Sequence, residues 1–360
     1  MRRFAAIAMV LLILSAPLAS GCVRTGDAGD GKLSIVCTVF PQYDWVRQIL
    51  GDRAGEMNLT LLINNRIDLH NYQPSVEDIV KISTCDLFIY VGGESDKWVG
   101  GILGEGATAD MAVINLLELL GDSARIEEIV EGMEDEDHDD HDSHGDGDAD
   151  DDHDKGDDYD DHDEGDIHDD HDDGDDDHDH EADFDEHVWL SLRNAHIFCT
   201  AIADALSSLD AANAAQYSSN AAAYIGELSA LDAKYQAALD AAAYRTLLFG
   251  DRFPFRYLVD DYGLSYYAAF SGCSAETEAS FETIVFLARK MDELMLPCVM
   301  VTESSDQSIA RTIIQNTAAR NYKICVLDAM QSVTSGDVQS GATYISIMES
   351  NLGVLRDALK

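Results

Sequence analysis

Short apolar runs alternate with amphipathic segments along most of the chain. Runs rich in β-branched and aromatic residues predict buried strands, and the segments between them have helical spacing. The predicted strands are 33–40, 56–63, 87–91, 246–249, 265–270, 298–303 and 323–327. The predicted helices are 43–50, 76–83, 194–209, 281–294, 307–319 and 344–359. Strands that alternate with helices in this way predict an α/β fold with mostly parallel sheets.

A long segment rich in alanine interrupts this alternation. Residues 211–243 contain no proline and a single glycine, Gly226, and Asp210 is the expected N-cap. This composition has strong helix propensity, and some thirty helical residues would span roughly 50 Å. The helix either braces two lobes or lies on the surface of one domain, and propensity alone does not distinguish these arrangements.

A second interruption is strongly charged. Between Glu134 and Glu186 there are 32 acidic residues and nine histidines. Because such a segment buries too little apolar surface to fold, we expect residues 134–183 to form a disordered loop. Imidazole and carboxylate groups bind first-row metals, so nine histidines favour metal capture over a purely solvating linker. The histidines of this auxiliary metal loop are His138, His141, His144, His153, His162, His168, His171, His178 and His180.

The charge of the chain is concentrated in this loop. The formal net charge is −46, and residues 134–186 supply −31 of it, which leaves −15 for the other residues. No basic patch is present to displace counterions from phosphates, which argues against a nucleic-acid partner. Cations are the natural ligands of such a field.

The N-terminus has the features of a bacterial secretion signal. Arg2 and Arg3 precede an apolar stretch, 5–14, that is too short to span a bilayer. Small residues before Cys22 resemble a lipobox, so Cys22 is the expected lipidation site, with plain cleavage near Ala19 as the alternative. We therefore expect a protein at the extracytoplasmic face of the cell membrane, lipid-anchored at Cys22, or periplasmic or secreted without the lipid.

Six further cysteines are scattered along the chain and form no CxxC pair. This spacing does not support a clustered zinc–thiolate site. Export permits disulfides, and Cys298–Cys325 is the first pair to test, although several cysteines fit equally well as small buried hydrophobic residues. The six are Cys37, Cys85, Cys199, Cys273, Cys298 and Cys325.

Three histidines lie outside the acidic loop. His70 follows the second predicted strand, where open α/β sheets place ligands, and His187 stands where the acidic loop returns to ordered structure. His196 falls inside a predicted helix and is expected to be structural or exposed. His70 and His187 are therefore the candidate metal ligands.

Several short stretches follow one another in a specific order along the chain. They are 38–44 (TVFPQYD), 68–74 (DLHNYQP), 86–90 (DLFIY), 187–190 (HVWL), 221–228 (AAAYIGEL), 274–278 (SAETE) and 301–303 (VTE). Together they resemble the zinc- and manganese-type substrate-binding proteins of ABC importers. The resemblance covers essentially all of the mature chain, and the order of the stretches is more specific than any one of them.

This resemblance implies two α/β lobes, each with a mostly parallel sheet flanked by helices, joined by a long rigid helix with a metal cleft between the lobes. A monomer is expected. The implied organisation is a signal peptide (1–22), a tether (23–32), an N-terminal lobe (33–133 and 184–209), the Asp/His-rich loop (134–183), the linking helix (210–243) and a C-terminal lobe (244–360).

The resemblance also implies a ligand set. His70 and His187 match the two N-lobe ligands, and Asp328 matches the fourth position. At the third position an ungapped count reaches Arg252, which has no acceptor atom, whereas a shift of one residue reaches Asp251, the expected ligand. The alternative is that Asp251 pairs with a neighbouring arginine and water completes the site.

The expected function is capture of Zn²⁺ and delivery to the membrane permease of an ABC importer, with no catalytic residues. A set of two histidines and two aspartates leaves manganese or iron open, whereas a histidine-rich loop is typical of zinc-handling relatives. An extracellular zinc buffer or adhesin is a second reading. A zinc metalloenzyme fits less well, because the sequence contains no HExxH pair.

Overall fold

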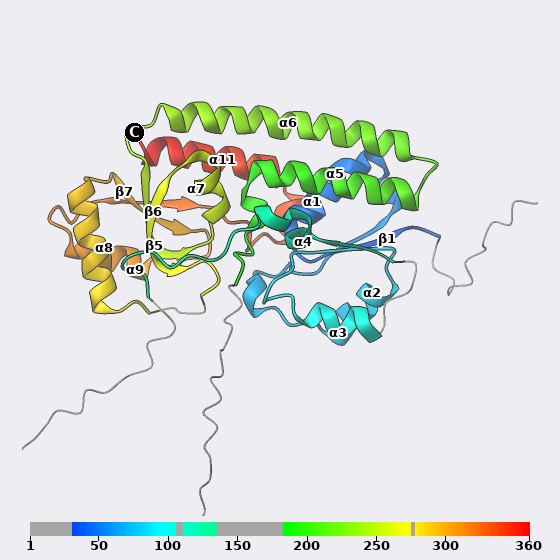
Figure 1. The fold of residues 1–360 in the computed structure, drawn as a ribbon, viewed down its shortest axis with the longest axis horizontal. Coiled ribbons are helices and arrows are strands. Elements are labelled where there is room, and N and C mark those ends of the chain that lie inside the picture. The colour runs from blue at the N-terminus through cyan, green and yellow to red at the C-terminus, as the bar shows by residue number, and fades with distance from the viewer. Residues whose placement is uncertain (1–30, 106–110, 135–182, 275–277) are drawn as a thin grey trace, which may run out of the picture. The chain divides into compact units, whose positions relative to one another are not determined.

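The chain folds around two four-stranded sheets, as a computed structural model shows (Figure 1). The structure describes residues 31–105, 111–134, 183–274 and 278–360. The strand orders are β2-β1-β3-β4 and β6-β5-β7-β8, and every strand pair is parallel. The predicted class, two mostly parallel sheets flanked by helices, is therefore confirmed.

The strands are short and close to their predicted positions. The first sheet contains β1 (Ser34–Cys37), β2 (Asn58–Leu61), β3 (Leu87–Tyr90) and β4 (Ala112–Asn115), and the second contains β5 (Thr246–Phe253), β6 (Ser265–Ser271), β7 (Cys298–Thr302) and β8 (Lys323–Leu327). Strand β4 was not predicted. It is an edge strand with one buried residue in four, so its apolar signal is weak.

Helices surround both sheets. Those on the N-terminal side are α1 (Phe40–Leu50), α2 (Val76–Thr84), α3 (Trp98–Glu105), α4 (Leu116–Leu120) and α5 (Leu192–Leu209), followed by the long helix α6 (Ala214–Asp240). The second sheet is accompanied by α7 (Arg256–Tyr262), α8 (Phe281–Leu294), α9 (Ser308–Asn316), α10 (Ser335–Gln339) and α11 (Tyr344–Ala358). Short 3-10 helices are η1 (Gly51–Glu56), η2 (Leu69–Asn71), η3 (Gly121–Ser123) and η4 (Val188–Leu190). We call β1–β4 with α1–α5 the N-lobe and β5–β8 with α7–α10 the C-lobe.

The first predicted strand is shorter than the apolar run that contains it. Strand β1 ends at Cys37, and α1 already begins at Phe40. Pro41 stands in the first turn of α1, where a residue without a backbone N–H is tolerated. The end of β1 and the start of α1 are both buried and apolar, so the sequence shows one continuous apolar run there.

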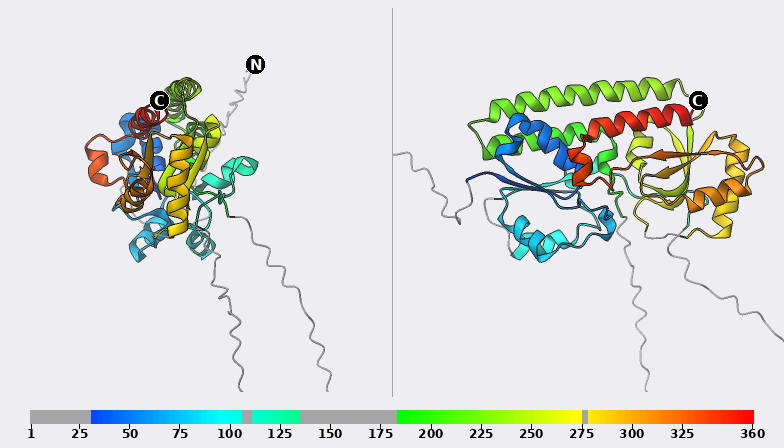
Figure 2. Two further views of the ribbon diagram at one scale, coloured as in Figure 1. Left: turned by 90° about the vertical axis from the view of Figure 1, so that its left-hand side faces the viewer. Right: turned by 180° about the vertical axis from the view of Figure 1, so that it is seen from behind.

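Helix α6 runs along both lobes, as Figures 1 and 2 show. It packs on α1 and α5 of the N-lobe and on α7 and α11. Its buried face recurs every three or four residues: Tyr217, Ala221, Tyr224, Leu228, Leu231, Tyr235 and Leu239. The prediction that Asp210 caps this helix was wrong. Asp210 ends α5, and its carboxylate instead accepts hydrogen bonds from Asn213 and Tyr217, each at 2.7 Å.

Strand β5 contains a bulge that the sequence pattern does not predict. Its register with β6 shifts between Phe249 and Arg252, so one extra residue is accommodated there. Gly250 lies so close to α9 that a Cβ at this position would be 2.7 Å from the Ala310 Cα. The predicted strand 246–249 therefore continues as a bulged strand through Asp251 to Phe253.

The six described cysteines are free thiols. Cys298 and Cys325 lie on the adjacent strands β7 and β8. A hydrogen bond between them raises the pKa of Cys298 and lowers that of Cys325 to about 7.

We therefore expect a mild thiol oxidant to close Cys298–Cys325 before any other pair. The thiolate is the attacking species in disulfide formation, and Cys325 is the thiol whose pKa favours it. Closing this loop should raise the free energy of unfolding by about 3 kcal/mol. Peptide mass mapping without reduction checks the pairing, and Cys325→Ser is the control. A different first disulfide would contradict the expectation.

Two predicted regions lie outside the described residues. They are the signal peptide with Cys22 and most of its tether, and nearly all of the Asp/His-rich loop, including its nine histidines. Within the described part of the chain, no helix combines the length and hydrophobicity needed to cross a bilayer.

Candidate metal centre

His70 stands in η2, in the segment that follows β2. Asp68 caps this turn, and its Oδ1 accepts from the His70 backbone N–H at 3.1 Å. The His70 Nδ1 is 2.7 Å from Ser95 Oγ and 3.3 Å from Glu186 Oε2. With Nδ1 bound in this way, Nε2 is the nitrogen left to meet a metal.

His187 is the N-cap of η4 and is fully buried. Asp185 Oδ1 accepts from both the His187 backbone N–H at 2.8 Å and the ring Nδ1 at 3.0 Å. Burial lowers the pKa of His187, but the charge and hydrogen bond of Asp185, helped by Asp68 and Glu186, outweigh it and raise the pKa. A carboxylate on Nδ1 fixes the ring so that the Nε2 lone pair is available to a cation.

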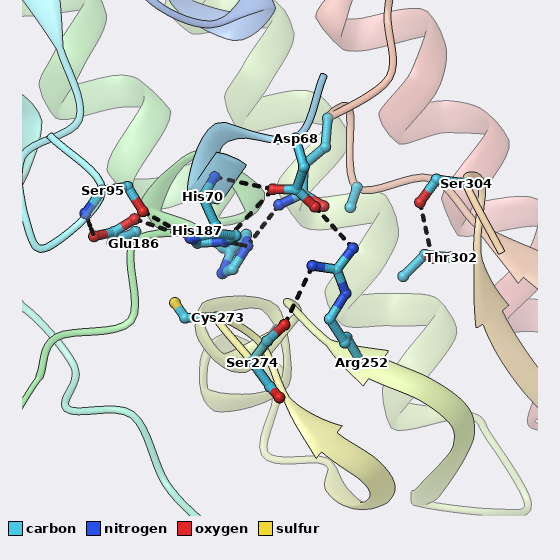
Figure 3. A network of polar contacts seen from close by, with 12 residues as sticks. Asp68, His70, Ser95, Glu186, His187, Arg252, Cys273, Ser274, Thr302 and Ser304 are labelled. Atoms are coloured by element: carbon cyan, nitrogen blue, oxygen red, sulfur yellow. Dashed lines mark hydrogen bonds and ion pairs between the residues drawn. The ribbon is translucent and has the colours of Figure 1, made fainter. Parts of the chain in front are cut away.

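The two imidazoles meet through these Nε2 atoms, which are 3.3 Å apart (Figure 3). Two nitrogens on one tetrahedral zinc, each about 2.05 Å from it, lie roughly 3.3–3.4 Å apart. The structure therefore brings the two predicted histidines together at the separation of zinc ligands. His196 lies on the exposed side of α5, as predicted.

Two further side chains reach this pair, and neither was predicted. Gln331 Nε2 is 2.8 Å from His187 Nε2. Cys273 follows β6, and one potential ligand atom from each of His70, His187 and Cys273 lies within 4.8 Å of the others. Among the described residues, these three side chains form the group of histidine, cysteine or acidic residues that is close enough together to hold a metal ion. The scattered spacing of the cysteines in the sequence did not indicate that Cys273 would lie beside the histidines.

The structure places Asp251 and Arg252 on different sides of the bulged strand. Asp251 Oδ2 accepts from the backbone N–H of Thr302 at 2.9 Å and from its hydroxyl at 2.6 Å. Arg252 enters the cleft instead and donates to Asp68 Oδ2 at 2.8 Å (Figure 3). In this arrangement Asp251 is engaged by β7 and is not grouped with the histidines.

Asp328 lies at the end of β8. Its Oδ1 accepts from the Met330 backbone N–H at 2.7 Å, and burial, with the charge of Glu303, raises its pKa to about 6. Glu303 accepts from the backbone N–H groups of Ala329 and Gln331, which holds the loop that carries Gln331. The Asp328 carboxylate is therefore engaged by its own loop, while the Asp328 backbone exchanges hydrogen bonds with the Asn351 side chain of α11 at 2.8 and 2.9 Å.

A cleft of about 700 Å³ lies beside the histidine pair. His70, Arg252 and Cys273 line it together with Trp98, so both lobes contribute to its walls. Carboxylates are frequent in the lining: Glu94, Glu127, Asp183 and Glu186. Asp183 is the last residue of the predicted Asp/His-rich loop and the first that the structure describes after residue 182, so the C-terminal end of that loop lies at the cleft.

Asp96 holds the segment that carries Ser95. Its Oδ2 accepts from the backbone N–H groups of Val91 at 2.9 Å and Gly92 at 3.0 Å. Burial raises the pKa of Asp96 to about 7, and the charge of Glu186 adds to this, although the two hydrogen bonds oppose it. The carboxyl is therefore protonated in the folded state at pH values where it is ionised in the unfolded chain.

Since the folded state binds the extra proton, Asp96 should make the protein lose stability as the pH rises from about 4 to 7. One pKa unit corresponds to about 1.4 kcal/mol, so the change amounts to a few kcal/mol. Asp96→Asn should flatten this part of the pH–stability curve, measured by denaturant unfolding. An unchanged slope in the variant would show that Asp96 does not titrate in this range.

The comparisons with known proteins agree with one another. A family model described as zinc-uptake complex component A, periplasmic, matches residues 35–358. The zinc-binding lipoprotein AdcA of Streptococcus pneumoniae is 31% identical over 350 residues, which cover 97% of this chain and 60% of AdcA. The high-affinity zinc uptake system protein ZnuA of Bacillus subtilis is 25% identical, over 98% of this chain and 96% of its own length. The chain thus spans about 60% of the length of AdcA but nearly all of this ZnuA.

Solved structures give the same picture. The Zn(II)-bound ZnuA-like domain of Streptococcus pneumoniae AdcA superposes with a TM-score of 0.64 at 26% identity, covering 91% of this chain and 99% of that domain. The lipoprotein YcdH of Bacillus subtilis, with a TM-score of 0.66 at 22% identity over 91% of this chain and 100% of its own, supports the fold. Because the family model spans nearly the whole described fold, this chain belongs to the family of zinc-uptake complex component A proteins.

Proposed function

We propose that this protein captures Zn²⁺ outside the cytoplasm and delivers it to the membrane permease of an ABC importer. The observation that carries the proposal is the pair of imidazole Nε2 atoms, 3.3 Å apart at the wall of a cleft lined by both lobes. The relatives named for zinc binding or zinc uptake support it. Zinc is the cargo here, and no residue is assigned a catalytic role.

The surroundings of the pair support binding of a cation. Asp185 orients His187, and Glu186 and Ser95 orient His70, so that both Nε2 lone pairs face the same point. Two lone pairs at this distance repel each other unless a cation or a shared proton lies between them. Carboxylates that hydrogen-bond the distal nitrogen of a ligating histidine also raise its basicity.

The metal content of protein that lacks residues 135–182 tests the proposal. This deletion removes the nine loop histidines but keeps Asp183, Asp185 and Glu186. We expect one tightly held zinc per chain after purification without added metal, and the midpoint of thermal unfolding should rise with added zinc. Manganese or iron in its place would favour the other branch of the family, and loss of all tight binding would indicate a buffer whose capacity lies in the loop.

We further propose that lipidation at Cys22 holds the protein at the extracytoplasmic face of the membrane, as a monomer that meets its permease there. The lipobox-like sequence before Cys22 supports this anchor. Cys22→Ser should move the protein from the membrane fraction to the soluble fraction. Fractionation by centrifugation measures this, and membrane association that survives the substitution would argue for another anchor.

A further inference from the structure

Cys273 lies where a third protein ligand of the histidine-bound ion would be needed. Its Sγ and one ring nitrogen from each of His70 and His187 are within 4.8 Å of one another. A zinc–sulfur bond is about 2.3 Å long, so a tetrahedral zinc places sulfur roughly 3.6 Å from each nitrogen ligand. The two Nε2 atoms already have their required spacing, and each separation between the sulfur and the grouped ring nitrogens exceeds the expected value by no more than about 1.2 Å.

The backbone around Cys273 is held against the histidines. A Cβ on Gly272 would be 2.9 Å from the Phe253 carbonyl oxygen and 3.2 Å from the ring of His187, so only glycine allows this close approach. The Cys273 backbone N–H donates to Glu127 Oε1 at 2.8 Å. The backbone at Gly272 and Cys273, which carries the thiol, is therefore held by neighbours on both sides.

Arg252 explains why the ligand comes from the segment after β6 rather than from β5. The bulge in β5 turns Arg252 into the cleft, where it donates to Asp68 and, at 3.3 Å, to the Ser274 carbonyl oxygen. A guanidinium has no acceptor atom and stays protonated, so it cannot bind zinc. Its contact with Ser274 instead supports the loop next to Cys273, and Figure 3 shows Arg252 and Cys273 at the same side of the histidine pair.

We propose that Cys273 is the C-lobe ligand of the captured zinc, bound as a thiolate beside His70 and His187. This inference rests on the proposed function of the cleft. On binding, the S–H bond breaks, a sulfur–zinc bond forms, and the proton passes to the buffer without any change of oxidation state. The side-chain oxygen of Gln331, once its amide has turned, or a water molecule takes the fourth position.

A thiolate ligand also determines which metal the site prefers. Soft sulfur ligands suit zinc, whereas manganese prefers carboxylates, carbonyls and water. A site with two imidazoles and a thiolate should therefore favour zinc over manganese more strongly than one with two histidines and two carboxylates. Cys273 is thus a specificity-determining residue of the cleft.

Cobalt(II) spectroscopy of the full chain tests this assignment. Bound thiolate gives cobalt an intense sulfur-to-metal charge-transfer absorption in the near ultraviolet. The Asp/His-rich loop contains no cysteine, so this absorption is independent of metal in the loop. We expect the absorption in the wild type and in Cys325→Ser, a matched variant on β8, but not in Cys273→Ser. Zinc should also protect Cys273 from alkylation, read by mass spectrometry of its peptide, and this protection should disappear in His187→Ala.

Cys273→Ser should release zinc to a competing chelator at a concentration at least ~100-fold lower than the wild type requires, beyond the effect of losing a residue that only orients a ligand. Equal melting temperatures of the metal-free variant and wild type would show that the substitution leaves the fold intact. If the wild type shows no sulfur-to-cobalt absorption but loses tightly held zinc on His70→Ala, the assignment of Cys273 is overturned and the proposed function stands. If the wild type holds no zinc against the chelator, both are overturned.

Discussion

Replacing either His70 or His187 by alanine should abolish tight zinc binding in protein that lacks residues 135–182. The two Nε2 atoms are 3.3 Å apart and both side chains are oriented by hydrogen bonds through Nδ1. Loss of a residue that merely orients a metal ligand typically lowers affinity 10–100-fold, so loss of a ligand itself should cost at least ~100-fold. Isothermal titration calorimetry with zinc measures the change.

His196→Ala is the matched control, because His196 is an exposed histidine of α5 away from the pair. It should bind zinc like the unsubstituted protein. If His70→Ala and His187→Ala both keep the control's affinity, the metal centre lies elsewhere and the geometry of the pair has no functional meaning.

The same titration tests the two aspartates predicted from the resemblance. Asp251 and Asp328 accept hydrogen bonds from Thr302 and from the Met330 backbone, so either would have to leave these contacts to bind metal. A large loss of affinity in Asp251→Asn or Asp328→Asn would support that rearrangement. Affinity close to that of the unsubstituted protein would favour a C-lobe ligand from another element.

The second large effect concerns stability. Trp189→Ala should lower the free energy of unfolding by about 3–5 kcal/mol, the usual cost of truncating a buried aromatic side chain. Trp189 is fully buried in η4, and its indole N–H donates to the Ala329 carbonyl oxygen at 2.9 Å, from the N-lobe to the loop after β8. Its carbonyl oxygen accepts from the Tyr344 hydroxyl at 2.7 Å. Urea unfolding followed by fluorescence and circular dichroism measures the loss.

Trp189→Phe separates packing from hydrogen bonding. It keeps an aromatic ring but leaves the Ala329 carbonyl without the indole donor, so its cost should be smaller than that of alanine. The alanine variant should also bind zinc less tightly, because the Trp189 ring contacts the His187 ring edge-on, with centroids 5.4 Å apart. A loss below 1 kcal/mol in Trp189→Ala would contradict the structural role assigned to this contact.

The residues that the N-lobe contributes to the candidate metal centre could be predicted from the sequence, whereas those from the C-lobe could not. His70 and His187 stand out because both lie outside the Asp/His-rich loop and outside the predicted helices. His70 follows a predicted strand, and His187 stands where the acidic loop ends. Cys273 and Gln331 carry no such signal. A single cysteine is chemically ambiguous, and a glutamine becomes notable only when its amide is found 2.8 Å from a buried imidazole.

The sequence alone determined the alternation of strands and helices, because burial leaves a local periodicity in the chain. It also determined the long helix α6, through alanine-rich propensity. From composition it predicts export by the N-terminal segment and metal capture by the Asp/His-rich loop. The tertiary structure decided what depends on contacts between distant residues. A bulge in β5 turned Asp251 towards Thr302 and Arg252 into the cleft, and the close approach at Gly272 brought Cys273 to the histidines. One residue of register reverses the direction of a side chain, and register is set by neighbouring strands and by α9, which no local pattern reveals.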